Sequence, residues 1–377
     1  MSTLHRYLEA QIVSDLKEKM VFLGGPRQVG KTTFSQSLLR SPKLIESSYY
    51  NWDDFEDRKK IQERVWSKDQ KLIVLDEIHK FPKWRSLIKG IFDKQKNEHQ
   101  FLVTGSARLD YYRKSGDSLL GRYYYYRLHP LSPTELKDHT SLQTLLQFGG
   151  FPEPFLKQNL RFLKRWHLGR RERIIYSDIR ELEKVREVAM IGQLCEALAP
   201  RVGSPLSRKN LAQDLEVDFK TAERWLQILE NVYYCFRISA YGTTGFRSVK
   251  KEQKVYLWDW SEHSDEGKRW ENFVASQLLK YCHFHQDIFG DKMELKFLRD
   301  DFGREVDFVV LKNSEAIFAV EAKVSESRSI SPHLKYFSER VKIPKFYQVH
   351  SGKNSFVIDQ KTKSLSFADF AKETILI

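Results

Sequence analysis

Residues 25–32 read Gly25-Pro26-Arg27-Gln28-Val29-Gly30-Lys31-Thr32, and Thr33 follows them. This octet fits the G-x-x-x-x-G-K-[ST] pattern of a phosphate-binding loop. A short apolar segment, residues 19–23, precedes the loop, and a segment of helical character, residues 32–39, follows it. Strand, loop and helix in that order predict the first unit of a P-loop α/β domain, with a sheet covered on both faces by helices.

The residue types of this loop suit a bound nucleoside triphosphate. Its glycines let backbone N–H groups turn toward phosphate oxygens, and the positive end of the following helix faces the same charge. Lys31 is predicted to reach the β- and γ-phosphates, and Thr32 to ligate Mg²⁺. We therefore expect ATP and Mg²⁺ as cofactors, with a binding set of Gly25, Pro26, Arg27, Gln28, Val29, Gly30, Lys31, Thr32 and Thr33.

A second motif supplies the acidic residues that ATP hydrolysis needs. Residues 72–77 read Leu-Ile-Val-Leu-Asp-Glu, an apolar strand that ends in two carboxylates. Asp76 is predicted to hold the Mg²⁺ shell, and Glu77 to orient and activate the attacking water. Lys31, Asp76 and Glu77 are therefore the predicted catalytic centre.

Two further residues are weaker catalytic candidates. Residues 101–106 form a third predicted strand that ends in hydroxyl side chains, so Ser106, or less readily Thr104, would contact the γ-phosphate or the water. A turn that merely caps this strand explains the same residues as well. Arg122 is a candidate arginine finger, a cation often supplied by a neighbouring subunit, and an ordinary surface arginine is the alternative.

Composition places the chain among folded proteins with a basic surface. Of its 377 residues 41% are apolar, and the formal net charge is +13 with a pI near 9.4. No apolar run approaches the roughly 20 residues that span a bilayer, and residues 1–11 lack a secretory apolar core. Three scattered cysteines favour a reducing compartment. We expect a cytoplasmic protein without membrane segments, and the excess charge permits a partner such as DNA.

Two predicted strands near the C-terminus carry a second set of charged residues. Asp307 lies on the strand 304–311, and Glu321 and Lys323 share one face of the strand 317–323. Asp307 and Glu321 are predicted to bind Mg²⁺, with Lys323 beside them and Glu271, on the preceding helix, as an outer carboxylate. The alternative is that the strands and the helix keep this arrangement while the domain no longer cleaves DNA.

The middle of the chain combines a helix–turn–helix pattern with basic residues. Residues 206–215 and 220–233 are predicted helices, and residues 234–240 and 254–258 are predicted strands around a basic wing. Residues 157–173 carry a local excess of six positive charges. One interpretation is that these segments bind nucleic acid. The alternative is that residues 157–173 form a solvated face of the lid of the ATPase domain and that the helix–turn–helix segment packs between subunits. The candidates for nucleic-acid contact are Lys164, Arg165, Arg170, Arg171, Arg224, Arg247 and Lys250.

Motifs spread over nearly the whole chain carry a family resemblance. They are the loop at 25–33, Leu75-Asp76-Glu77-Ile78 with Trp84, Thr104-Gly105-Ser106, Leu120-Gly121-Arg122, Gly149-Gly150-Phe151-Pro152, Asp178-Ile179, Trp270-Glu271-Asn272-Phe273-Val274, Glu305-Val306-Asp307-Phe308 and Glu321-Ala322-Lys323. The chain resembles prokaryotic AAA+ ATPases whose C-terminal half is a domain of unknown function with a nuclease-like fold.

The resemblance implies a domain order. We expect an AAA+ core at residues 1–150, a basic helical lid or connector at 151–190, a winged-helix segment at 191–262 and a PD-(D/E)XK nuclease-like α/β domain at 263–377. Assembly into a ring, often of six subunits, is implied by the AAA+ likeness alone.

The expected function is that of a Mg²⁺-dependent ATPase that acts on DNA as a ring, processing or remodelling branched or damaged DNA. A regulatory switch or protein remodeller with an inert nuclease-fold module is the first alternative. An ATP-gated, metal-dependent DNA nuclease is the second.

Overall fold

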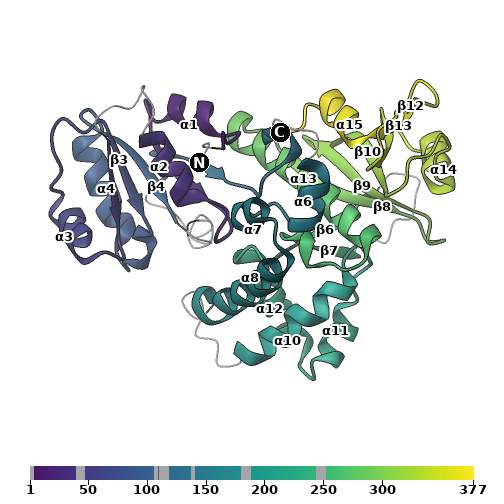
Figure 1. Ribbon diagram of the computed structural model, residues 1–377, viewed down its shortest axis with the longest axis horizontal. Helices are drawn as coiled ribbons and strands as arrows, with labels where there is room; N and C mark the ends of the chain where they lie inside the picture. The colour runs from purple at the N-terminus through teal and green to yellow at the C-terminus, as the bar shows by residue number, and fades with distance from the viewer. Residues whose placement is uncertain are drawn as a thin grey trace. The chain divides into compact units, whose positions relative to one another are not determined.

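The computed structural model describes residues 4–39, 47–105, 109, 119–136, 141–179, 188–242 and 252–377 (Figure 1). The chain divides into two compact units, one of residues 1–130 with 231–233 and one of residues 131–230 with 234–377. Within the described residues, no helix has the length and apolar character needed to cross a membrane.

The first unit is built on a five-stranded parallel sheet, as the P-loop pattern predicts. The strand order is β2-β3-β4-β1-β5, and every neighbouring pair runs parallel. The buried strands β1 and β3 coincide with the predicted apolar segments, whereas β2 was not predicted. The bounds are β1 Met20–Gly24, β2 Ser47–Asn51, β3 Leu72–Asp76, β4 Gln100–Thr104 and β5 Tyr123–Arg127.

Helices cover both faces of this sheet because side chains alternate along each strand. Phe22, Ile73 and Val103 project from one face and share a core with Trp84 and Ile88 of the helix α4. The helix α2 packs against β3 and β4. The helices are α1 Glu9–Asp15, α2 Lys31–Leu39, α3 Phe55–Glu63 and α4 Trp84–Gln95, with the short 3-10 helix η2 Ile78–Lys80 (Figure 1).

This topology places the predicted nucleotide residues together. Parallel strands end at a common edge, and in open α/β sheets ligands bind beyond the carboxyl ends of the strands. The loop at residues 25–30 leaves β1 at this edge, and β3 ends there with Asp76. Because β1 and β3 run parallel, the loop that follows β1 and Asp76, which ends β3, lie at the same edge of the sheet.

The second unit begins with helices. The helix α8 starts where the Asn159 side chain accepts a hydrogen bond of 2.9 Å from the N–H of Phe162, a normal N-cap. The elements are η4 Pro133–Glu135, α6 Ser141–Phe148, α7 Pro152–Lys157, α8 Leu160–Arg173, the π-helix η5 Ile174–Ile179, α10 Val188–Leu198, η6 Ala199–Arg201, α11 Arg208–Asp214, α12 Phe219–Asn231 and η7 Trp260–Glu262.

The second unit also holds an eight-stranded mixed sheet of order β12-β13-β11-β10-β9-β8-β6-β7. The two strands predicted beside the winged-helix pair, β6 and β7, belong to this sheet, so it draws strands from both sides of the expected boundary near residue 262. Its elements are β6 Cys235–Ala240, β7 Gln253–Leu257, α13 Glu266–Phe289, β8 Met293–Arg299, β9 Glu305–Lys312, β10 Glu315–Lys323, α14 Pro332–Arg340, β11 Phe346–His350, β12 Phe356–Val357, β13 Thr362–Ser366 and α15 Phe367–Thr374.

Candidate functional site

The loop after β1 has the backbone that its glycines permit. Gly25 and Gly30 have φ angles of 138° and 96°, a region that side chains with a Cβ rarely adopt. A Cβ on Gly25 would lie 2.5 Å from the carbonyl oxygen of Leu128. The loop is therefore pressed against the chain that leaves β5, and glycine at position 25 is a steric requirement.

Lys31 lies along this loop. Its side chain is buried, and its Nζ donates hydrogen bonds of 2.9 and 2.8 Å to the carbonyl oxygens of Gly25 and Pro26. The helix α2 begins at Lys31, so the ammonium group belongs to the same first helical turn as N–H groups that have no acceptor within the helix. An anion at this place would meet both.

Asp76 is the centre of a hydroxyl network. One carboxylate oxygen, Oδ2, accepts hydrogen bonds of 2.9 Å from Thr32 and 2.5 Å from Tyr49, and the other, Oδ1, accepts one from Thr104. Burial, followed by the Asp76 contact, raises the pKa of Tyr49 well above its usual range, so this phenol remains a donor. Thr104 faces Asp76 and is fully buried. Tyr49 was missed because a tyrosine on an unpredicted strand carries no motif signal.

Glu77 follows Asp76 in a constrained geometry. Its φ of 56° is left-handed, and its backbone N–H donates a 3.0 Å hydrogen bond to the carbonyl of Thr104. Its carboxylate Oε2 lies 3.4 Å from Nε2 of the buried His79. Burial raises the pKa of Glu77, which brings the carboxylate toward the range of an effective general base.

Ser106 lies outside the described residues, and Arg122 lies at the opposite edge of the sheet from the loop. Met20 pairs with Tyr123, so Arg122 precedes the amino end of β5. Its Nε and Nη2 donate hydrogen bonds of 2.8 and 3.2 Å to the carboxylate of Asp93. A five-residue strand spans about 16 Å. Arg122 is thus too distant for its own nucleotide site, and only a second copy would place it at one.

The N-terminal segment supports the loop, which the sequence did not predict. The buried Arg6 donates a 3.1 Å hydrogen bond to the carbonyl of Val29, and a second one to the carbonyl of His129. The Tyr7 hydroxyl donates to the carbonyl of Arg127 at 2.5 Å. A charged residue near a terminus is usually solvated, and only the fold shows that this arginine ties the loop to the segment after β5.

The second unit gathers the predicted C-terminal acids around a lysine that was not singled out. Lys254, on β7, is fully buried, and its Nζ lies 3.5 Å from Glu271 Oε1 and 3.7 Å from Asp307 Oδ1. It also forms an ion pair with Glu305. Tyr256 donates a 2.8 Å hydrogen bond to Glu271. We call these residues the Lys254 cluster.

Glu321 and Lys323 form the other side of this cluster. Lys323 Nζ lies 2.8 Å from Glu321 Oε1, as expected for residues two apart on a strand. The N–H of Ala322 donates a 2.8 Å hydrogen bond to Asp307, which connects β10 with β9. Burial, followed by the Asp307 charge, raises the pKa values of Glu271 and Glu321.

The described basic candidates differ in their environment. Lys164 and Arg165 are exposed on α8, as is Arg224 on α12. Arg170 is buried, 3.3 Å from Glu262, and its guanidinium lies over the ring of Phe151. Arg171 lies 3.5 Å from both Glu196 and Glu262. Arg170 and Arg171 therefore hold the helices together. Arg247 and Lys250 lie outside the described residues.

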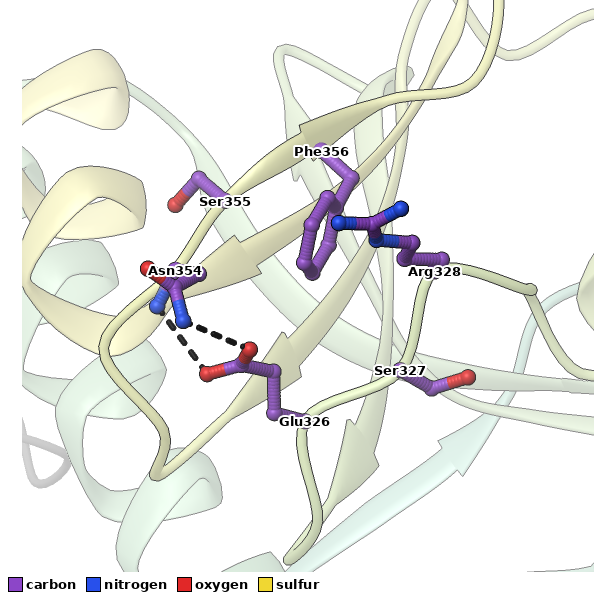
Figure 2. A pocket seen from close by; sticks show the side chains of 6 residues that line it. All are labelled: Glu326, Ser327, Arg328, Asn354, Ser355 and Phe356. Carbon is purple, nitrogen blue, oxygen red and sulfur yellow. Dashed lines mark hydrogen bonds between the residues drawn. The ribbon is translucent and has the colours of Figure 1, made fainter.

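A polar hollow on the second unit involves none of these residues. It is lined by Glu326, Ser327, Arg328, Asn354, Ser355 and Phe356 (Figure 2). Glu326 accepts hydrogen bonds from the backbone N–H groups of Lys353 and Asn354 at 3.1 and 3.0 Å, and Arg328 lies over the Phe356 ring. The Glu326 carboxylate thus joins the segment after β10 to the turn before β12.

The fold and the loop together define a P-loop nucleotide-binding domain. Residues 17–137 match the family described as an AAA domain, so the first unit is an AAA-type P-loop domain. Residues 139–261 and 266–370 match two families described as domains of unknown function, DUF8612 and DUF4143.

Full-length relatives and solved structures are distant. An uncharacterized protein of Mycobacterium tuberculosis is 23% identical over 320 residues, covering 78% of this chain and 70% of its own. An uncharacterized protein of Haemophilus influenzae is also 23% identical, and the match covers 91% of this chain and 92% of the relative. The Aeropyrum pernix ORC1 protein in complex with DNA is 13% identical at a TM-score of 0.34, with coverages of 72% and 93%. The Thermotoga maritima RuvB Holliday junction branch migration motor is 17% identical at a TM-score of 0.30. This match covers 61% of this chain and 87% of the RuvB chain.

Proposed function

We propose that this chain is a Mg²⁺-dependent ATPase that acts on DNA as a ring. The observation that carries the ATPase proposal is the contact between the two nucleotide motifs, Thr32 to Asp76 at 2.9 Å beside the buried Lys31. These groups have the chemistry that a triphosphate and its metal require, and Glu77 lies next to them in sequence.

The donor set fits a Mg²⁺ ion that arrives with the nucleotide. Mg²⁺ takes oxygen ligands and is often held by one or two protein groups together with phosphates and water. Thr32 and Asp76 offer a hydroxyl and a carboxylate side by side. When bound, the ion would neutralise charge on the phosphates and would take the place of the direct Thr32–Asp76 contact.

Side chains and backbone groups of the chain would bind the phosphates and activate the water. Lys31 would exchange its two carbonyl partners for phosphate oxygens, and the N–H groups of the loop would cradle the same phosphates. Glu77 would orient a water molecule and accept its proton, for which the raised pKa is suited. His79, 3.4 Å away, would hold the Glu77 carboxylate in position.

An exposed cationic face on α8 supports the DNA part of the proposal. Arg161, Lys164 and Arg165 are exposed there, and within the described part of the chain none of them pairs with a carboxylate. Arg161, Arg165, Lys157 and Phe162 line one hollow. Exposed cations beside an aromatic ring suit a nucleic-acid backbone. Arg122, distant from its own site, supports self-association.

ATP turnover with and without DNA at low salt tests the whole proposal. We expect Mg²⁺-dependent turnover that DNA stimulates, and a mass in solution that corresponds to a multimer. Turnover without any response to single-stranded, duplex or branched DNA would instead favour the protein-remodelling alternative. Absence of turnover in all conditions would contradict the ATPase assignment itself.

A further inference from the structure

The Lys254 cluster has a cation of its own. A lysine ammonium removed from water is costly unless opposite charges surround it. Lys254 is fully buried and faces Glu271, Glu305 and Asp307. Three carboxylates within 3.7 Å of its Nζ compensate the charge that burial would otherwise disfavour. The ammonium group therefore stays charged.

Cations of the chain offset part of the negative charge of the cluster without a metal. Its four carboxyl groups belong to Glu271, Glu305, Asp307 and Glu321. Lys254 and Lys323 lie among them, and Arg299, whose Nη1 lies 3.1 Å from Glu305, is shared with Glu252 at 3.5 Å. A divalent ion would bring two further charges to this site.

One oxygen of Glu271 and one of Asp307 already face Lys254. A Mg²⁺ ion would lie about 2 Å from its oxygen ligands. Glu271 Oε1 and Asp307 Oδ1 lie 3.5 and 3.7 Å from the Lys254 ammonium, so an ion drawn to them would be repelled by that charge. Within the described residues, no group of three or more acidic, histidine or cysteine side chains is arranged to hold a metal.

We propose that Lys254 is the permanent cation of this cluster: Glu271 ties α13 to β7 through it, Asp307 ties β9 to β10, and Glu271, Asp307 and Glu321 bind no divalent metal. Tyr256, which shares Glu271 with Lys254, acts as a second internal partner. The domain accordingly does not cleave phosphodiesters by a metal-dependent route. This proposal stands independently of the ATPase and DNA assignments, because it concerns residues outside the nucleotide site.

Metal binding by the full chain tests the proposal directly. Mn²⁺ is titrated without nucleotide into the Asp76→Asn variant, which lacks the metal carboxylate of the ATP site, and free Mn²⁺ is followed by electron paramagnetic resonance. We expect no bound Mn²⁺ at millimolar concentration. One Mn²⁺ bound per chain, and released on the further change Asp307→Asn, would overturn the proposal.

Charge compensation provides a second readout that does not depend on metal. Lys254→Met should lower the thermal unfolding midpoint, because the Glu271 carboxylate loses its cation. Adding Glu271→Gln should restore part of the midpoint, because the uncharged amide needs no cation. Lys280→Met is the matched control: Lys280 is equally buried but pairs with Glu135. Glu271→Gln should not restore that variant.

The charge-compensation test can still be carried out when the single variant folds poorly. If Lys254→Met does not accumulate as folded protein, the yield of the Lys254→Met/Glu271→Gln variant is compared with it, and we expect a several-fold gain. A double variant no more stable and no more abundant than Lys254→Met would contradict the assignment of Lys254 as the charge partner of Glu271.

Discussion

The hydroxyl of Thr32 donates a 2.9 Å hydrogen bond to the carboxylate of Asp76, although 44 positions separate the two residues in the chain. Thr32 follows the phosphate loop at the end of β1, and Asp76 ends β3. In the proposed ATP site this hydroxyl and this carboxylate would both serve a Mg²⁺ ion that arrives with the nucleotide. The contact links the two halves of the proposed ATP site.

Glu77→Gln should separate ATP binding from hydrolysis. The amide retains the size of the side chain but cannot accept a proton, so turnover should fall by about a hundredfold or more. ATP binding should persist, measured by equilibrium titration with a fluorescent analogue. Glu63→Gln, an exposed change on α3, is the control. Turnover by Glu77→Gln at the parent rate would remove Glu77 from the mechanism.

The hydroxyl network around Asp76 should be needed for activity. Thr104→Val keeps the shape of a fully buried side chain and removes one hydrogen bond to a charged group. Such a bond contributes about 1.5–3 kcal/mol, so we expect a roughly tenfold or greater loss in kcat/KM for Mg·ATP. Tyr49→Phe should act in the same direction.

Tyr50→Phe is the control for this network. Tyr50 neighbours Tyr49 on β2, but its hydroxyl bonds to Gln70. This variant should turn over ATP as the parent does. Equal rates for Thr104→Val, Tyr49→Phe and the parent would show that Asp76 does not depend on these hydroxyls.

The sequence predicted the parts of this site that local rules determine. A glycine pattern between a strand and a helix has few alternatives, so the loop and the AAA-type P-loop fold were predictable. Tyr49 and Arg6 were not, because their roles depend on tertiary contacts with Asp76 and with the Val29 carbonyl. The same limit applies to Lys254, whose strand shows nothing of the acids that the fold brings to it.

The predicted basic residues show the limit of charge counting. Residues 157–173 carry many cations, but α8 buries Arg170 against Glu262 and leaves Lys164 exposed. The same helix leaves the apolar side chain of Leu160 54% exposed. Which face of a helix is covered depends on neighbours that one segment does not reveal.

Arg122 should act between subunits if it is catalytic. Arg122→Ala should lower turnover, and mixing it with the Lys31→Ala variant should restore part of the activity, because mixed assemblies contain sites with an intact loop and an intact arginine. Asp93→Asn frees Arg122 from its ion pair and should leave turnover intact or raised. Activity that is unchanged in Arg122→Ala would assign this residue to the Asp93 contact alone.

The exposed face of α8 should carry a salt-dependent DNA contact. Changing Arg161 and Arg165 together to alanine should weaken binding for all DNA sequences. The slope of log K against log salt should fall in magnitude by about 2, close to one unit for each phosphate that the variant no longer neutralises. Lys372→Ala, on a side chain that is 74% exposed, is the control. An unchanged slope in the double variant would place the DNA contact elsewhere.

The His167–Asp259 pair predicts how stability varies with pH. Burial lowers the pKa of His167, but the neighbouring Asp259 carboxylate outweighs it, so the net pKa is raised. The Nε2–Oδ2 distance is 3.4 Å. A raised histidine pKa adds stability that is complete below its unfolded value of about 6.5 and is lost as pH rises through the folded value.

Comparison with His167→Gln isolates this contribution. The unfolding midpoint of the parent should exceed that of the variant most clearly near pH 6, and the difference should shrink by pH 9. Thermal unfolding followed by circular dichroism gives the comparison. A difference that grows from pH 6 to pH 9 would have the wrong sign for a protonated His167 paired with Asp259.

The most direct measurement is ATP binding and turnover by Lys31→Ala beside the parent protein, with Mg²⁺ present and with folding checked by circular dichroism. The proposed site predicts that the parent binds and hydrolyses ATP, and that the variant remains folded but loses nucleotide affinity and turnover together. A folded Lys31→Ala protein that binds and hydrolyses ATP as the parent does would contradict the assignment of the loop at residues 25–32 as the catalytic phosphate site.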